Sequence, residues 1–231
     1  MKPVLRARDL SKSFGARKAL NGVSIDVQPG EFVAVLGASG SGKTTLFRCL
    51  TRLSEADSGE IELEGQPFHA LRGRQLAAAR RRIGVVFQQF NLIRRLSALD
   101  NVLAGRLAGA PLWRVMLRAF DGKDETIAIR ALREVGLGEH LDQRADTLSG
   151  GQQQRVAIAR AIAQHSHIIL ADEPVASLDP DSAGAVLELL HRLTRSSGMA
   201  IICTLHQPQL AVQFADRILT MEAGTLTHQR S

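Results

Sequence analysis

The most informative run in the chain is Phe32-Val33-Ala34-Val35-Leu36-Gly37-Ala38-Ser39-Gly40-Ser41-Gly42-Lys43-Thr44. Residues 32–36 are all apolar and are bounded by Pro29-Gly30 and by glycines, which is typical of a strand buried on both faces. Residues 37–44 fit the pattern G-x-x-x-x-G-K-[ST], and residues 43–53 are compatible with a helix. A strand, a glycine-rich loop and a helix in this order predict a loop that wraps around the phosphates of a nucleotide.

The chemistry of this phosphate loop, residues 37–44, follows from its residue types. Glycines let the backbone approach phosphates closely with the N–H groups pointing inward, and the N-terminus of the next helix adds partial positive charge. Lys43 is expected to reach the β- and γ-phosphates, and Thr44 to place its hydroxyl on Mg²⁺. The candidate nucleotide-binding residues here are Gly37, Ala38, Ser39, Gly40, Ser41, Gly42, Lys43, Thr44 and Thr45.

A second apolar run, residues 168–171, ends in the adjacent carboxylates Asp172 and Glu173. Open α/β sheets bind ligands at the carboxyl ends of their strands, and neighbouring strand residues point in different directions. We therefore expect Asp172 to hold Mg²⁺, directly or through water, and Glu173 to polarise an attacking water. Such a pair is by itself often a solvated turn, and the phosphate loop favours the catalytic interpretation.

The remaining pattern predicts an α/β fold with a mainly parallel sheet. Residues 5–8 and 23–27 alternate with period 2, which predicts an antiparallel strand unit at the N-terminus. Residues 168–171 and 199–203 predict buried strands, each after a helical segment, 152–164 and 182–195. This order implies a parallel sheet with right-handed crossovers. Between residues 89 and 163 the apolar side chains recur at helical spacing, which predicts an inserted helical part.

Composition and charge narrow the class of protein. The chain has 231 residues, 45% hydrophobic and 23% charged, which is typical of one large α/β domain or two small ones. Its formal charge of +6 indicates an acidic partner: a nucleotide, a nucleic acid or an anionic membrane surface. Only 4% of residues are aromatic and none is Tyr, which argues against a base-stacking platform for single-stranded nucleic acid.

Cysteine usage and the N-terminal residues point to a soluble, cytoplasmic chain. Cys49 and Cys203 have no Cys or His neighbour at metal-ligand spacing, so we expect two buried structural thiols. The first residues, MKPVLRARDL, lack the apolar segment of a signal peptide. Apolar runs such as residues 200–203 fall far short of the roughly 20 residues that a membrane helix requires. The chain is nevertheless able to dock on a membrane protein.

A further motif identifies a family resemblance. Residues 148–157 read Leu-Ser-Gly-Gly-Gln-Gln-Gln-Arg-Val-Ala, and the first five resemble the LSGGQ signature of ATP-binding cassette (ABC) ATPases. Ser149 at a helix start also fits an ordinary N-cap, which is compatible with an anion site. The resemblance implies that Ser149, Gly150, Gly151 and Gln152 face the γ-phosphate of an ATP held by another protomer.

Other residues match the motifs of these ATPases in the expected order from Phe14 to His206. The resemblance implies that Gln88 senses Mg²⁺ and the attacking water, that Asp179 in the Ser177-Leu178-Asp179 segment crosses a dimer interface, and that His206 contacts the γ-phosphate. It also implies that Phe14 stacks on adenine, where the family often has Tyr. Each of these matches alone is weak evidence for the family, but their occurrence in the order of the family's motifs is specific evidence for it.

The resemblance predicts the assembly and the domain plan. It implies a single ABC ATPase domain over residues 1–231, with a nucleotide-binding core at 1–88 and 165–231 and a helical subdomain at 89–164. Two chains would meet head to tail around ATP and Mg²⁺. Residues 89–93 resemble the region that contacts a coupling helix of a transmembrane permease, although their apolar side chains equally fit a subdomain core. The expected location is peripheral, on the cytoplasmic face of the inner membrane.

Longer stretches indicate which transporters the chain resembles most. Residues 83–93 and 96–107, strengthened by Pro111-Leu112-Trp113-Arg114, resemble the ATP-binding subunit of phosphonate importers. An extracytoplasmic solute-binding protein would then be an indirect partner. The Phe-Gln-Gln-Phe-Asn-Leu run also occurs in polar amino-acid importers, so the ATPase subunit of such an importer, or of an exporter, is an alternative function.

A non-transport ATPase acting on nucleic acid is a more remote alternative, because only the short stretch of residues 89–147 separates Gln88 from the signature. We expect no nucleic acid partner. A non-hydrolysing regulator conflicts with the presence of Glu173.

Overall fold

A computed structural model describes residues 2–107 and 120–229 of the chain. The larger sheet has six strands in the order β10-β9-β3-β8-β7-β6. They are β3 (Phe32–Leu36), β6 (Ile83–Phe87), β7 (Ile168–Asp172), β8 (Ala200–Leu205), β9 (Arg217–Glu222) and β10 (Thr225–Gln229). All neighbours pair in parallel except β10, which is antiparallel to β9. The predicted parallel sheet is confirmed, with β3, β7 and β8 as its centre.

The smaller sheet contains the predicted antiparallel unit. Its strands are β1 (Leu5–Phe14), β2 (Arg17–Val27), β4 (Ser58–Leu63) and β5 (Gln66–Pro67), in the order β2-β1-β4-β5. Leu5 and Ala7 are completely buried, whereas Arg6 and Arg8 lie on the other face, as the alternation predicts. All pairs in this sheet are antiparallel.

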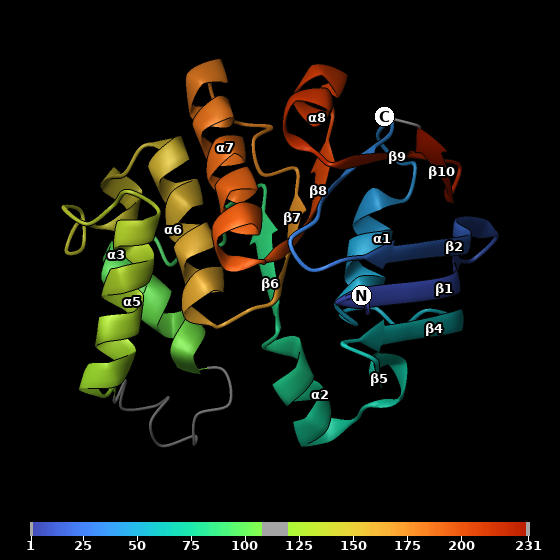
Figure 1. Cartoon of the computed structure of the whole chain (residues 1–231), viewed down its shortest axis with the longest axis horizontal. Helices are drawn as coiled ribbons and strands as arrows, with labels where there is room; N and C mark the ends of the chain where they lie inside the picture. The colour runs from blue at the N-terminus through green and yellow to red at the C-terminus, as the bar shows by residue number, and fades with distance from the viewer. Residues whose placement is uncertain (1, 108–119, 230–231) are drawn as a thin grey trace.

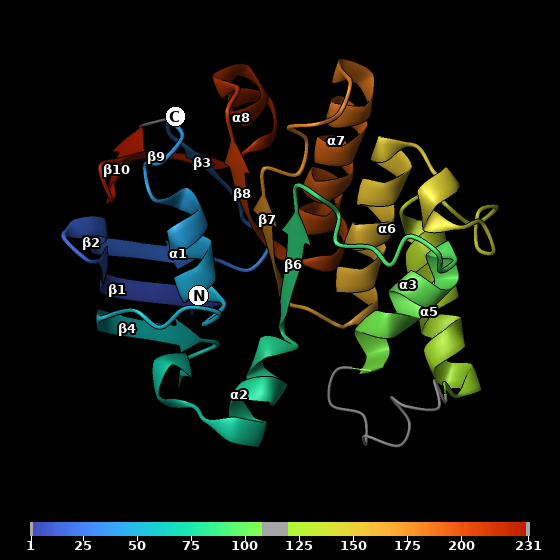
Figure 2. The same ribbon diagram turned by 180° about the vertical axis from the view of Figure 1, so that it is seen from behind.

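Helices cover the larger sheet on both sides (Figures 1 and 2). The helices of the described residues are α1 (Lys43–Leu50), α2 (Gly73–Arg80), α3 (Ala98–Ala104), α5 (Gly122–Glu134), α6 (Gly150–Ala163), α7 (Pro180–Ser197) and α8 (Pro208–Phe214), with 3₁₀ turns at Phe68–Ala70, Gly105–Leu107 and Ala145–Thr147. Of these, α3 and α5 pack against α6. Helix α1 ends three residues earlier than the sequence predicts. Arg52 leaves the helix with φ 55°, and its buried guanidinium donates to the carbonyls of Phe68 and Leu71.

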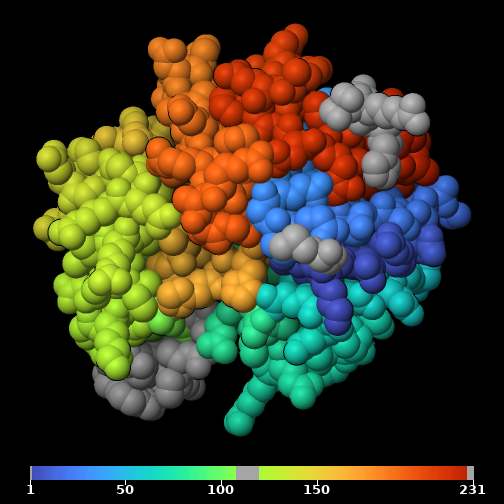
Figure 3. Space-filling view, in the orientation of Figure 1, coloured from blue at the N-terminus to red at the C-terminus, as the bar shows by residue number. Residues whose placement is uncertain are grey.

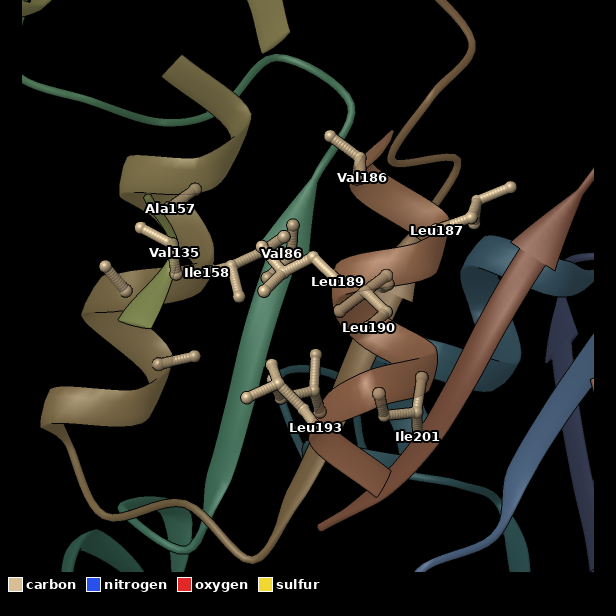
Figure 4. Packing of buried hydrophobic residues seen from close by; sticks show 14 of the residues in the cluster. Val86, Val135, Ala157, Ile158, Val186, Leu187, Leu189, Leu190, Leu193 and Ile201 are labelled. Atoms are coloured by element: carbon tan, nitrogen blue, oxygen red, sulfur yellow. The ribbon is translucent and has the colours of Figure 1, made fainter. Parts of the chain in front are cut away.

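Two apolar layers explain why the central strands do not alternate in hydrophobicity. Phe32 and Ala34 of β3 face a core that contains α3, α5, α6 and α7. Val33 and Val35 face a second core made by α1 and the smaller sheet. In Figure 4, Ile158 of α6 and Val86 of β6 belong to the first layer, together with leucines of α7. A strand between two such layers must be apolar on both faces.

The predicted helical part consists of α3, α5 and α6 in the residues that the structure describes, and Figure 3 shows it forming one side of the molecule. The expected amphipathic stretch from Leu112 to Phe120, with Trp113, lies outside the described residues except for Phe120. Both predicted thiols are buried, and burial raises the pKa of Cys49 to about 11. Within the described ranges, every helix is too short or too polar to cross a membrane.

Candidate functional site

The phosphate loop joins the carboxyl end of β3 to the N-terminus of α1, as the sequence predicts. Gly42 precedes the helix with φ 114°, and a Cβ there would lie 2.4 Å from the carbonyl oxygen of Ala19, so the position requires glycine. Lys43 is nearly buried, and its Nζ donates to the carbonyls of Gly37 (2.7 Å) and Ala38 (3.1 Å). The ammonium group of Lys43 therefore lies against the backbone of its own phosphate loop. Ser41 Oγ is buried and has no hydrogen-bond partner among the described residues.

A surface pocket of about 330 Å³ lies beside this loop. Its lining combines the aromatic side chain of Phe14, the basic side chains of Arg17 and Lys43, and the carboxylate of Glu173. The lining residues from the loop and the start of α1 are Ser39, Gly40, Gly42, Lys43, Thr44 and Thr45. Phe14 is 54% exposed, and the ammonium of Lys12 lies over its ring, 5.6 Å from the ring centroid. Arg17 Nη2 donates to the carbonyl of Gly40 at 2.7 Å and fixes the tip of the loop.

The two carboxylates lie at the carboxyl end of β7, next to the loop. Asp172 is the last residue of the strand, and burial raises its pKa, helped by the negative charge of Glu173; hydrogen bonds from Thr204 and Thr44 and the charge of Lys43 oppose the rise. Glu173 follows in the left-handed region, with φ 50°. Glu173 therefore lies outside the extended backbone of β7, and the strand alternation expected for the two carboxylates does not extend to it.

Glu173 has a partner from the next strand. His206 follows β8 directly, and its Nε2 lies 2.6 Å from Glu173 Oε1. Both side chains are partly exposed and line a small pocket beyond the strand ends. The chain thus brings together two residues that lie 33 positions apart in the sequence (206 − 173).

Gln88 follows β6, the strand that pairs with β7, and it lines a groove of about 480 Å³ together with Thr44, Asp172 and Glu173. Phe90 and Asn91, just beyond it, both have positive φ. Their carbonyls accept hydrogen bonds from the guanidinium of Arg160 on α6, at 3.2 and 2.7 Å. Figure 2 shows the chain crossing here from the sheet to the helical part.

The donor set at this edge fits Mg²⁺. The Thr44 hydroxyl, the Gln88 amide and the Asp172 carboxylate are oxygen donors that border one groove. Among the described residues, no three Cys, His, Asp or Glu side chains form a cluster able to enclose a metal ion. Mg²⁺ typically binds through one or two carboxylates together with substrate phosphates and waters, so this sparse set suits it.

The LSGGQ-like segment lies elsewhere, at the start of α6. Ser149 caps the helix: its Oγ accepts from the N–H of Gln152, and Gln152 Oε1 accepts from the N–H of Ser149. A Cβ on Gly150 would touch Leu178, and one on Gly151 would touch Ser182 at 3.0 Å. Asp179, the N-cap of α7, accepts from the N–H of Ser182. The signature and the Ser177–Asp179 segment are therefore neighbours within one chain, on the helical side of the sheet.

Two residues of this region, Arg17 and Thr204, are not indicated by the sequence motifs. Arg17 lies at the start of β2 and reaches the loop across the fold. Thr204 on β8 contacts both Asp172 and Glu173 through its hydroxyl. Neither belongs to a motif, and their roles depend on strand register and not on local sequence.

Comparisons with known proteins identify the family of this chain. Residues 20–176 match the family model described as ABC transporter. The chain is 47% identical to a phosphonates import ATP-binding protein, PhnC 2, of Rhodopseudomonas palustris, over 96% of this chain and 82% of that protein. It is 48% identical to the hypophosphite import ATP-binding protein HtxD of Stutzerimonas stutzeri over 95% of this chain, and it spans 64% of the length of that relative.

A solved structure shares the fold of this chain. The dimeric structure of MJ0796, a bacterial ABC transporter cassette, superposes with a TM-score of 0.83 at 32% identity, covering 98% of this chain and 99% of that one. The fold is the ABC ATPase fold expected from the sequence, with its parallel core, antiparallel N-terminal sheet and helical insert. This chain belongs to the ABC transporter family.

Proposed function

We propose that this chain is the ATP-hydrolysing subunit that powers import of phosphonates through a membrane ABC transporter. The observation that carries the ATPase part is the meeting of the phosphate loop, Asp172 and the Glu173–His206 pair at the carboxyl ends of neighbouring parallel strands. Phosphoryl transfer to water depends mainly on positioning and charge neutralisation, and these groups supply both.

Each predicted site residue has a role in this proposal. Phe14 stacks on adenine, residues 37–45 bind the phosphates through backbone N–H groups, and Lys43 turns from its own loop toward the β- and γ-phosphates. Thr44, Gln88 and Asp172 would hold Mg²⁺, which when bound neutralises phosphate charge. Glu173 orients and activates the water, and His206, already at hydrogen-bonding distance from Glu173, completes the site.

The signature segment acts on a second chain in this proposal. Ser149, Gly150, Gly151 and Gln152 present a capped helix N-terminus to the γ-phosphate bound by the partner, and Asp179 lies at the same interface. A head-to-tail pair with two-fold symmetry uses each surface twice. The dimeric state of the related cassette supports this arrangement.

The groove beside Gln88 is the proposed contact for a transmembrane permease. It is lined by α1 residues such as Phe47, by Leu53 just beyond α1, and by Gln89 and Asn91. Leu53 is 61% exposed and Ile93 is 55% exposed, whereas Leu92 packs against the core. Within residues 89–93, Leu92 is therefore part of the core, whereas Ile93 is exposed and available for a contact with the permease. Exposed apolar side chains around a groove are typical of a protein contact.

Leu53→Asp is expected to uncouple transport while leaving ATP binding by the isolated chain unchanged. A carboxylate on this rim would have to be desolvated by an apolar partner helix, which costs several kcal/mol if it stays unpaired, on the order of the penalty for burying a charge. Val212→Asp on α8, 73% exposed and away from the groove, is the matched control. The measurement is co-purification with the permease and uptake in whole cells; normal assembly of Leu53→Asp would remove this surface from the proposal.

The proposed substrate class is inferred from the names of the relatives, and no residue of this chain identifies it. The names of the relatives above refer to import of phosphonates and hypophosphite, both phosphorus oxyanions. Recognition of the solute would belong to the permease and an extracytoplasmic solute-binding protein, with this chain peripheral on the cytoplasmic face of the inner membrane. These names favour a phosphorus-compound importer over an amino-acid importer or an exporter.

Growth on a phosphonate as sole phosphorus source tests whether the transporter imports phosphonates. A strain lacking this chain is expected to fail on the phosphonate and to grow normally on orthophosphate, with rescue by the wild-type gene but not by Glu173→Gln. A parallel culture on hypophosphite separates the two solute classes that the relatives name. Normal growth on the phosphonate would remove that substrate and leave the ATPase proposal intact.

A further inference from the structure

A buried hydroxyl links the carboxylate of Asp172 to the backbone of Glu173. Strand β8 places Ala200, Ile202 and Thr204 on the face toward α1, and the first two are buried apolar residues of the core there. Thr204 is also completely buried, so its polar atom needs a partner. Its Oγ1 donates to Asp172 Oδ1 at 3.0 Å and accepts from the N–H of Glu173 at 2.7 Å. The single donor of this hydroxyl is therefore used on Asp172.

The register of the sheet creates this contact. Ala171 of β7 pairs with Cys203 of β8, which brings Asp172 and Thr204 side by side at the carboxyl ends of the strands. Glu173 turns away with φ 50°, a conformation that non-glycine residues rarely adopt unless their surroundings hold it. The hydrogen bond from its N–H to Thr204 supplies such a constraint.

We infer that Thr204 is a positioning residue: its hydroxyl holds the carboxylate of Asp172 and the backbone of Glu173 in the relative orientation that hydrolysis requires. This inference rests on the ATPase function proposed above. Thr204 needs no contact with nucleotide or water, because it acts through the carboxylate of Asp172 and the backbone of Glu173. Because the side chain lies in an apolar row, valine would fill nearly the same space without offering a donor or an acceptor.

Thr204→Val therefore tests the positioning role of the hydroxyl while it keeps the shape of the side chain nearly unchanged. We expect kcat for ATP hydrolysis by the purified full chain to fall roughly 10- to 100-fold, the range for loss of a hydrogen bond to a charged group. KM for ATP should change by less than about threefold, because the phosphate loop is untouched. Mn²⁺ binding in the presence of ADP, followed by electron paramagnetic resonance, should weaken because Asp172 is no longer held.

Three further variants separate positioning from packing. Thr204→Ser keeps the hydroxyl and should restore most of the rate and of the Mn²⁺ affinity. Thr194→Val removes another buried hydroxyl, which donates to the carbonyl of His191 within α7, and should change thermal stability but not kinetics. If Thr204→Val does not fold, the Thr204→Ser and Thr204→Ala pair gives the same comparison of hydroxyl and no hydroxyl.

The outcomes distinguish this inference from the proposed function. Wild-type kcat and Mn²⁺ affinity in Thr204→Val would overturn the inference, as would equal losses in the serine and valine variants. A wild-type chain without Mg²⁺-dependent hydrolysis would overturn the proposed ATPase function, and the Mn²⁺ measurement would still decide the role of Thr204.

Discussion

Glu173→Gln is expected to lose most ATP turnover while the protein still binds ATP. The amide has nearly the shape of the carboxylate but cannot accept a proton, and removal of a positioned general base typically costs roughly 10²- to 10⁴-fold in rate. Glu173 lies beyond β7 at the rim of both the loop pocket and the groove, so the phosphate-binding residues are unaffected by the change. The proposed head-to-tail pair forms around bound ATP, so a variant that binds ATP without hydrolysing it should accumulate as an ATP-bound dimer.

The measurement combines phosphate release, ATP affinity and size-exclusion chromatography with and without ATP. Glu125→Gln on the exposed face of α5 makes the same chemical change far from the site and serves as the control. Near-normal phosphate release by purified Glu173→Gln would contradict the role assigned to this residue. A monomer in saturating ATP would instead count against the head-to-tail pair.

The local structures at the candidate site that the sequence predicts are those encoded by contiguous residues. The phosphate loop needs glycine at a position such as Gly42, where φ is 114° and the carbonyl of Ala19 leaves no room for a Cβ. The capped start of α6 likewise depends on Ser149 and Gln152 alone. Such features are local, so their residue types and spacing carry the information.

The strand and the site residues that the sequence does not predict depend on contacts between distant segments. Strand β6 contains Gly84, which lowers its strand propensity, yet a Cβ there would lie 2.7 Å from the Cβ of Ala161 on α6. Glycine is required by helix–sheet packing, a tertiary constraint. Thr204 is an ordinary strand residue until the register with β7 sets its hydroxyl against Asp172. Arg17 likewise has no signal apart from its contact with Gly40.

Lys43→Ala is expected to weaken ATP binding itself, in contrast to Glu173→Gln. Lys43 Nζ bonds to the carbonyls of Gly37 and Ala38, so the ammonium already lies over the loop where the β- and γ-phosphates are proposed to bind. Loss of one hydrogen bond between charged groups typically costs about 1.5–3 kcal/mol, which corresponds to a roughly 10- to 100-fold weaker affinity. Turnover should fall with it, because the same charge stabilises the transferring phosphoryl group.

The experiment should compare ATP, ADP and AMP, since this comparison locates the effect on the nucleotide. A lysine that binds the β- and γ-phosphates contributes most to ATP, less to ADP and nothing to AMP, whereas a collapsed loop would weaken all three. Lys123→Ala at the exposed start of α5 removes the same charge from the chain and controls for long-range electrostatics. Unchanged ATP affinity in a folded Lys43→Ala protein would exclude the loop as the phosphate site, and equal losses for ATP and AMP would assign Lys43 a structural role through its two carbonyl contacts.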